Sequence, residues 1–101
     1  MYRGTTPTLT FTLPIEAATI TALNIALAQR GRVLVSRSLA DVKIEGNEIE
    51  TTLTESETLA LHAGCNLQIQ LRVGVDETRI ASQIFDVPVE RILQEGKLNE
   101  L

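Results

Sequence analysis

The segment from Leu67 to Val75 alternates strictly between apolar and polar residues. Every second side chain is Leu, Ile or Val, while Gln68, Gln70 and Arg72 occupy the positions between them. A strand that is buried on both faces would be a continuous apolar run. The period of two therefore predicts a strand of an antiparallel sheet with one buried face and one solvated face.

Comparable short segments recur along the chain, separated by turn signals about every eight to twelve residues. Arg30-Gly31 and Gly46-Asn47 are typical of tight hairpin turns. Pro7 and Pro14 bracket the first segment and predict an edge strand, because proline cannot donate a hydrogen bond to a neighbouring strand. Besides residues 67–75, the predicted strands cover Thr8–Leu13, Glu16–Gln29, Arg32–Arg37, Asp41–Glu45, Glu48–Leu53 and Ile80–Val89.

The segment from Glu16 to Gln29 is compatible with two structures. Its alanines, and the spacing of Ile20, Leu23 and Leu27, suit a helix. The same stretch also alternates apolar residues with small ones, as a strand does. We favour the strand, because the turn at Arg30-Gly31 would pair it with the β-forming residues that follow.

The last predicted strand changes its pattern part-way along. We expect it to follow a loop of about three to five residues at Asp76-Glu77-Thr78. Ile80 and Ile84 share one parity, whereas Phe85 and Val87 share the other. A β-bulge near Ile84 or Phe85 would let both sets reach the core.

Two short helical turns are also predicted. Thr54 and Glu57 have the spacing of a capping box, which predicts a turn or two of helix that ends at Gly64. Residues 97–101 are expected to fray. A second, amphipathic turn is predicted before Gly96 from the helical spacing of Val89, Ile92 and Leu93.

Together these segments predict an all-β protein, an antiparallel immunoglobulin-like β-sandwich of about seven strands with a short helical turn. Its 101 residues form a single domain, 1–101, which is large enough for a hydrophobic core without disulfides or metal. The predicted core comprises Phe11, Leu23, Ile25, Leu27, Val33, Val35, Ile49, Leu53, Leu59, Leu67, Ile69, Leu71, Val73 and Phe85.

Composition disfavours several classes of function. The chain has 13 acidic and 9 basic residues and a formal charge of -4, so it lacks the cationic stripe of a nucleic-acid-binding protein. Its aromatic residues are only Tyr2, Phe11 and Phe85, too few for stacking on bases or sugars. We find no signal peptide and no apolar segment long enough to span a membrane.

The only chemically suggestive pair is His62 and Cys65. A cysteine nucleophile needs a thiolate held against an imidazole, and a spacing of three residues at a turn does not by itself provide that geometry. Two such ligands are also too few for structural zinc. A group of glutamates lacks the pattern of a calcium loop and is read as a solvated face; it contains Glu45, Glu48, Glu50, Glu55 and Glu57. We therefore expect no catalytic, cofactor-binding or metal-binding residues.

Several short motifs are nevertheless familiar. The chain resembles small uncharacterised proteins of phages and prophages of Gram-positive, firmicute-type bacteria over nearly its whole length. It departs from them in the alanine-rich segment from Glu16 to Ala28. The motifs that carry the resemblance are Tyr2-Arg3-Gly4-Thr5-Thr6-Pro7, Phe11, Leu13-Pro14, Gln29, Gly46-Asn47, Leu53-Thr54, Glu57-Thr58-Leu59, Gln70-Leu71-Arg72-Val73 and Ala81-Ser82.

The resemblance implies a phage-derived protein from the tail or baseplate region, located in the virion or the host cytoplasm. We expect it to be non-enzymatic and to act through contacts with phage structural proteins or with itself, without nucleic acid or membrane. The alternatives are a carbohydrate-binding surface-recognition module and, more weakly, a small enzyme that uses Cys65. The residues predicted for an interface are Gln68, Gln70, Arg72, Val89, Ile92 and Leu93.

Overall fold

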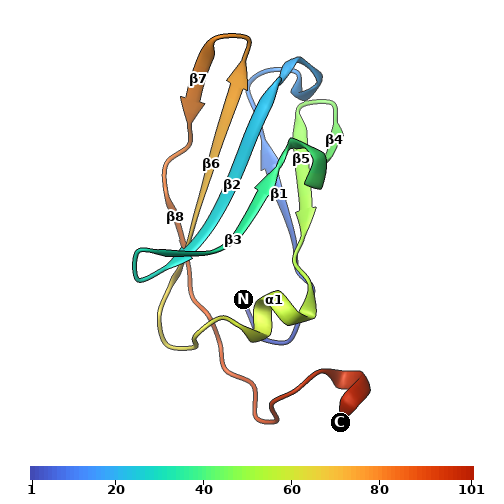
Figure 1. The fold of residues 1–101 in the computed structure, drawn as a ribbon, viewed down its shortest axis with the longest axis vertical. Helices are drawn as coiled ribbons and strands as arrows, with labels where there is room; N and C mark the ends of the chain where they lie inside the picture. Colours follow the sequence, from blue (N-terminus) through green and yellow to red (C-terminus); the bar gives the residue numbers. More distant parts are fainter.

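The computed structural model describes all residues from Met1 to Leu101 and contains eight strands in two antiparallel sheets (Figure 1). The smaller sheet has the order β1 (Thr8–Thr12), β5 (Glu48–Thr52) and β4 (Lys43–Glu45). The larger sheet has the order β3 (Arg32–Ser38), β2 (Ala22–Gln29), β6 (Leu67–Val75) and β7 (Thr78–Ala81), with β8 (Phe85–Val87) also paired to β6. The all-β, sandwich-like fold is thus confirmed, with one strand more than predicted.

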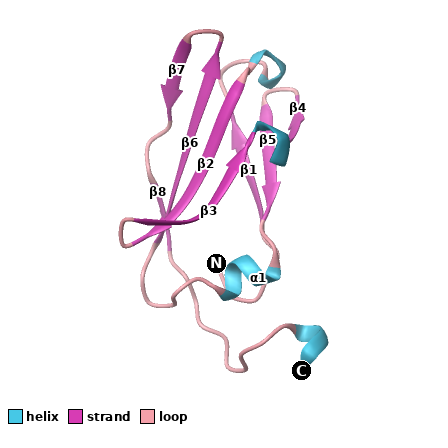
Figure 2. Ribbon diagram, in the orientation of Figure 1, coloured by secondary structure: helices cyan, strands magenta, loops and turns pink.

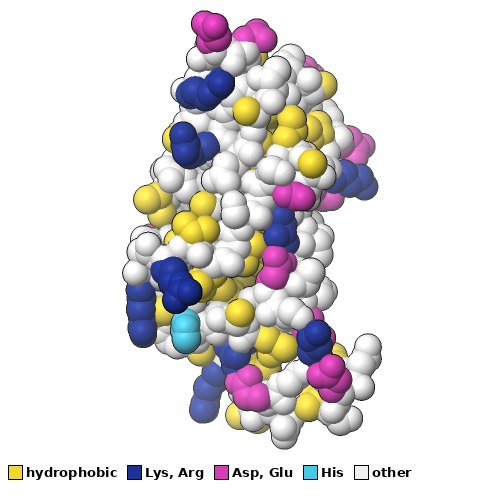
Figure 3. All heavy atoms as spheres, in the orientation of Figure 1, with side chains coloured by type: hydrophobic (Ala, Val, Ile, Leu, Met, Phe, Trp, Pro, Cys, Tyr) yellow, Lys and Arg dark blue, Asp and Glu magenta, His cyan; other side chains and the backbone are white.

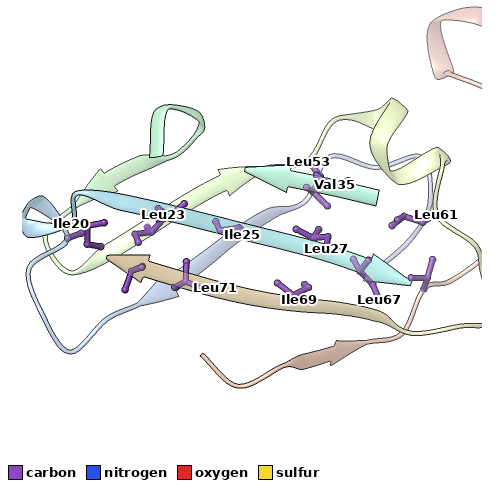
Figure 4. Close-up of a cluster of buried hydrophobic side chains, with 14 residues drawn as sticks. Ile20, Leu23, Ile25, Leu27, Val35, Leu53, Leu61, Leu67, Ile69 and Leu71 are labelled. Atoms are coloured by element: carbon purple, nitrogen blue, oxygen red, sulfur yellow. The ribbon is translucent and has the colours of Figure 1, made fainter. Parts of the chain in front are cut away.

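The core lies between the two sheets and is built mainly from the inner faces of β2 and β6. The strand that alternates most clearly in the sequence is confirmed as β6, and three of its four buried apolar side chains, Ile69, Leu71 and Val73, oppose buried apolar residues of β2. Figure 4 shows these two rows of side chains pointing to the same side of the larger sheet. The buried apolar residues are Ala17, Ile20, Leu23, Ile25, Leu27, Val35, Ile49, Leu53, Leu61, Leu67, Ile69, Leu71, Val73 and Val89.

The segment with two possible structures folds as the favoured strand. A short 3-10 helix, Ala17–Thr19, precedes β2, in which every second residue is buried. Arg30 and Gly31 both have positive φ, of 52° and 76°, which the two-residue turn between β2 and β3 requires. Because glycine adopts this conformation without steric cost, the turn forms where the sequence places it.

Two residues predicted for the core, Val33 and Phe85, are exposed. Val33 is 56% exposed because β3 contains a bulge at Leu34. Leu27 opposes Val35 but Ala28 opposes Val33, so the extra residue turns the side chain of Val33 away from the core. Two other predicted core residues, Phe11 and Leu59, are only half-buried.

The register against β6 shifts by one residue where the bulge was predicted: Ala81 opposes Arg72, and Phe85, four residues later, opposes Ile69, three residues earlier. The shift places Ile80 and Phe85 on the same, core-facing side, opposite Val73 and Ile69, although they stay 50% and 40% exposed. The chain leaves the ladder between the two strands, and Ile84 there is 52% exposed. The preceding turn is also shorter than predicted, because Val75 opposes Thr78 directly.

The predicted capping box begins α1 (Glu55–Leu59). Thr54 accepts a hydrogen bond from the Glu57 amide, and the Glu57 carboxylate accepts one from the Thr54 amide. The helix ends at Leu59, five residues before Gly64, and carries the chain from the smaller sheet to the larger. Figure 2 shows α1 at one end of the sheets, beside the N-terminus.

The C-terminal segment differs from its prediction. Val89, Ile92 and Leu93 form no helical turn, and a 3-10 helix occurs instead at Leu98–Glu100. No helix in the structure has the length and apolar character needed to cross a membrane.

Candidate functional site

The side of the larger sheet that faces away from the core, here called the outer face, carries the polar row predicted on β6. Gln68 and Arg72 are exposed there, and Gln70 is half-buried because its amide donates a hydrogen bond of 3.1 Å to the Ser82 carbonyl. The opposing positions of β2 are small or polar and are Asn24, Ala26 and Ala28. The outer face consequently carries short side chains along β2 and two glutamines and an arginine along β6.

A shallow hollow of about 360 Å³ lies at the β6–β7 end of the outer face. Two cross-strand rows of residues form it. One row contains Ala22, Gly74 and Arg79; the other contains Asn24, Arg72 and Ala81. Each row places one arginine beside small residues, so the two guanidinium groups flank a floor that has almost no side chains.

The glycine in this hollow leaves room for the close approach of Arg79. A Cβ atom at Gly74 would lie 2.7 Å from Nη1 of Arg79. That nitrogen donates hydrogen bonds to the carbonyls of Asp76 and Thr78 at 2.6 and 3.1 Å. The side chain of Arg72 makes no hydrogen bond or ion pair with the rest of the chain. Its guanidinium is therefore available to an external acidic group.

The charges of the surface are unevenly distributed. Figure 3 shows basic side chains spaced along the left margin, where β6, β7 and the β2–β3 hairpin lie. Acidic side chains lie mostly at the top and along the right margin, beside β4 and β5. A protein with a net negative charge thus presents one basic margin.

One long side of the sandwich, here called the open side, lies between β1 and the β7–β8 segment. An apolar hollow of about 240 Å³ opens there. Phe11 lines it from β1, and Ile80 and Phe85 line it from the other sheet, 50% and 40% exposed. No hydrogen bond joins β1 to β7 or β8 across this hollow. Apolar surface on this side is therefore accessible from outside.

The opposite side, here called the closed side, is held by Arg37 of β3. Its guanidinium makes a bidentate ion pair with the Glu57 carboxylate of α1, at 2.7 and 2.6 Å. The same group donates to the Thr51 hydroxyl and the Thr52 carbonyl of β5 at 3.0 and 3.2 Å. The hydrogen bonds from Arg37 lower the pKa of Glu57 to about 2. One side chain thus joins the larger sheet to the smaller sheet and to α1.

Two of the predicted interface residues belong to a structural contact between the chain ends. Residues 1–5 and 87–95 run together, with Tyr2 opposite Glu90 in a parallel bridge. Val89 is buried, and Ile92 is half-buried against Gly4. Leu93, in contrast, is 93% exposed. Of the residues predicted for an interface, Gln68, Arg72 and Leu93 are thus exposed, Gln70 and Ile92 are half-buried, and Val89 is buried by the chain itself.

Arg3 is the centre of this contact, here called the terminal clip. Its Nε donates to the Leu61 carbonyl at 2.7 Å, and its other nitrogens bond to the Leu59 carbonyl and to Glu95. Arg3 thus satisfies free carbonyls at the C-terminal end of α1. Thr5 and Thr58 also exchange hydrogen bonds, of 3.0 and 2.7 Å.

The predicted pair of His62 and Cys65 lies in a loop held by Gln29. The buried amide of Gln29 binds the His62 amide and carbonyl at 2.8 Å each, and the Cys65 carbonyl at 3.1 Å. The Cys65 thiol contacts the His62 carbonyl oxygen at 3.8 Å, so its contact is with the backbone of His62 and not with the imidazole ring. The histidine side chain itself is exposed.

Glu55 and Glu57, two members of the predicted acidic group, each bond to a different part of the chain. Glu57 pairs with Arg37, and the Glu55 carboxylate accepts a hydrogen bond of 3.0 Å from the Leu98 amide. No group of three or more His, Cys, Asp or Glu side chains is arranged to hold a metal ion.

Comparison with known proteins returned no match to a family model, a curated protein or a solved structure. Sequence reasoning missed Arg3, Gln29, Arg37 and Arg79. The hydrogen-bond partners of Arg3, Gln29 and Arg37 lie far away in the sequence, and Arg79 reaches the hollow through the pairing of β7 with β6. Of these four residues, Arg3 and Gln29 belong to the motifs that carry the resemblance.

Proposed function

We propose that the protein is a non-enzymatic structural or assembly protein of a phage or prophage, which acts through protein–protein contacts. The phage origin rests on the resemblance of its motifs, which extend from Tyr2 to Ser82. The contact role rests on one observation, the outer face with its arginine-flanked hollow. Arg72 and Arg79 give this flat surface a place for an acidic loop of a partner protein.

The geometry also favours contacts over a small-molecule site. The hollow is open and shallow, whereas sites for small molecules are usually deep and enclose most of the ligand. The short side chains along β2 let another backbone approach closely, and the basic groups at the end of the outer face would fix the orientation of the partner.

Carbohydrate recognition is the alternative. Asn24, Gln68 and Gln70 could bond sugar hydroxyls, but the outer face contains none of the three aromatic residues. Phe11 and Phe85 line the open side, and Tyr2 lies in the terminal clip. Saturation-transfer NMR with host-wall polysaccharide would detect sugar contacts, and signals mapped to the outer face would replace our proposal with this one.

Gene deletion tests the proposed function directly. In an inducible host, removing the gene is expected to lower the yield of infective particles and to leave incomplete tails in electron micrographs. The wild-type gene should restore assembly, and the double variant Arg72→Glu, Arg79→Glu should not. Arg91→Glu is the matched control, because Arg91 is exposed but lies away from the outer face. Normal particles and infectivity after deletion would overturn the proposal.

A further inference from the structure

The edges of the two sheets differ in how they are protected from pairing with another chain. β1 is flanked by Pro7 and Pro14, and β3 carries a bulge. β4 has only three residues, of which Lys43 and Glu45 are charged and exposed. Prolines, bulges and short charged strands all discourage edge pairing. β7 contains neither proline nor bulge, and all four of its residues are exposed.

The backbone of β7 has two residues directed to the free edge. Val75 opposes Thr78, Val73 opposes Ile80, and the Ser82 amide donates to the Leu71 carbonyl at 2.8 Å. Because successive residues of an antiparallel strand bond alternately to one side and the other, Ile80 bonds to β6. The N–H and C=O groups of Arg79 and Ala81 therefore point away from the sheet.

This arrangement is complementary to itself. When a second copy of β7 runs antiparallel along the edge, with the two-fold axis at Ile80, Arg79 lies opposite Ala81 of the second copy. The same pairing recurs on the other side of the axis, so the four outward-facing residues exchange four backbone hydrogen bonds. No residue is left without a partner in this register.

The side chains fit the same register. The two Ile80 side chains lie directly opposite each other on the core-facing side, at about 5 Å between Cβ atoms. Each is 50% exposed in the single chain, and each borders the apolar hollow that Phe85 lines. On the outer face, each arginine is opposite an alanine instead of another arginine. Pairing thus buries apolar surface without a direct clash of like charges.

We propose that two copies of the chain associate through antiparallel pairing of β7 with β7, centred on Ile80, to form one continuous sheet. The inference deepens the proposed function and rests on it, because it names a second copy as one of the proteins contacted. The pairing also brings the two arginine-flanked hollows together across the two-fold axis. Four arginines then line one band, and salt screens their repulsion, so association strengthens as ionic strength rises.

Disulfide trapping tests the register. Cys65→Ser removes the only native thiol, and Ile80→Cys in this background places two thiols at facing positions. Mild oxidation should give a disulfide-linked dimer that depends on protein concentration. The matched control is Ile84→Cys, because Ile84 is equally exposed, at 52%, but lies outside β7. Equal trapping of both variants, or of neither, overturns the proposal.

Sedimentation equilibrium tests association without cross-linking. The wild-type chain should form dimers reversibly as concentration rises, and Ile80→Lys should weaken the dimer by about tenfold or more, whereas Ile84→Lys should not. Ala81→Pro removes an outward N–H while leaving the β6–β7 bonds, and should also give a monomer. Circular dichroism establishes that each variant folds.

The outcomes separate this inference from the proposed function. A wild-type chain that stays monomeric across the concentration series overturns the β7 dimer, whatever the gene deletion shows. A dimer with the expected variant pattern supports the pairing even if deletion leaves phage particles normal, in which case only the proposed function fails.

Discussion

The closed and open sides of the sandwich join the same two sheets by different means. On the closed side, the guanidinium of Arg37 reaches β5 and α1 and pairs with Glu57 through two short hydrogen bonds. On the open side, Phe11 and Ile80 face an apolar hollow with no polar link across it. One side is fixed by directional bonds, and the other only by contact between apolar groups.

The difference separates stability from association. Directional bonds between partly buried charged groups define one geometry, and breaking them leaves a carboxylate without its partner. Exposed apolar groups beside a free strand edge contribute less to folding, because much of their surface is still in water. Substitutions on the closed side should therefore lower the stability of the fold, whereas substitutions on the open side should change mainly the association of two copies.

The largest expected effect falls on the core that both sides share. Leu71→Asp places a charge at a residue that is 4% exposed, and we expect it to unfold the domain, because an unpaired buried charge costs more than a small domain can supply. Gln70→Asp, one residue away on the outer face, should leave the protein folded. Thermal denaturation followed by circular dichroism measures both. Equal melting temperatures would contradict the assignment of faces.

The next largest effect tests the closed side. Arg37→Ala removes the partner of Glu57 and the link to β5, and should lower the free energy of unfolding by about 2 kcal/mol. Arg72→Ala is the matched control, because the guanidinium of Arg72 makes no bond within the chain. This variant should change the free energy of unfolding by less than about 0.5 kcal/mol. Urea denaturation gives both values. If the two variants lost the same stability, the contrast between the sides would fail.

The pH dependence of stability tests the ion pair between Arg37 and Glu57 without removing Arg37. Because Arg37 holds the pKa of Glu57 at about 2 in the folded chain, below its usual 4.5, the ionised carboxylate favours the folded state. This stabilisation is complete above about pH 4.5 and is lost as the pH falls towards 2, and we expect it to be about 1–2 kcal/mol.

Urea titrations of the wild-type chain and Glu57→Gln between pH 7 and pH 2 measure this dependence. The gap between the two free energies of unfolding should be constant above pH 4.5 and should close at lower pH. A gap that stays constant down to pH 2 would show that the ion pair does not contribute in the way described.

The smallest effect is expected on the open side. Phe85→Ala should cost about 1 kcal/mol, compared with about 3–5 kcal/mol for a fully buried phenylalanine, because 40% of its surface is already exposed. Differential scanning calorimetry gives the shift in melting temperature. A loss as large as that of a core phenylalanine would mean that the open side is closed in solution.

The sequence predicted the parts of the fold that depend on local patterns. The alternation of β6, the turn at Arg30-Gly31 and the capping box of Thr54 and Glu57 are all local, and the structure confirms each. The change of parity near Ile84 also predicted the one-residue register shift between Ala81 and Phe85. The bulge at Leu34 was not predicted, because it depends on the register of β3 with β2 and no local pattern marks it.

The candidate site was only partly predictable for the same reason. The row of Gln68, Gln70 and Arg72 follows from the period of β6, but the hollow also needs Arg79, which reaches it through the pairing of β7 with β6. Val89 and Ile92 are apolar and were assigned to an interface, whereas the chain itself covers them with residues 1–5. Periodicity identifies an apolar residue without identifying what covers it.

The terminal clip has a kinetic consequence. Arg3 bonds to Glu95, and the amino group of Met1 bonds to the Pro88 carbonyl, so these contacts span 92 and 87 positions of the chain. Contacts between such distant residues close late in folding, because the loop between them must first lose its conformational freedom. The contacts of Met1 and Arg3 with residues 88–95 therefore cannot form until that segment has been synthesised and the sheets have formed. We expect the clip to be the last part of the molecule to acquire protection in pulsed hydrogen exchange during refolding.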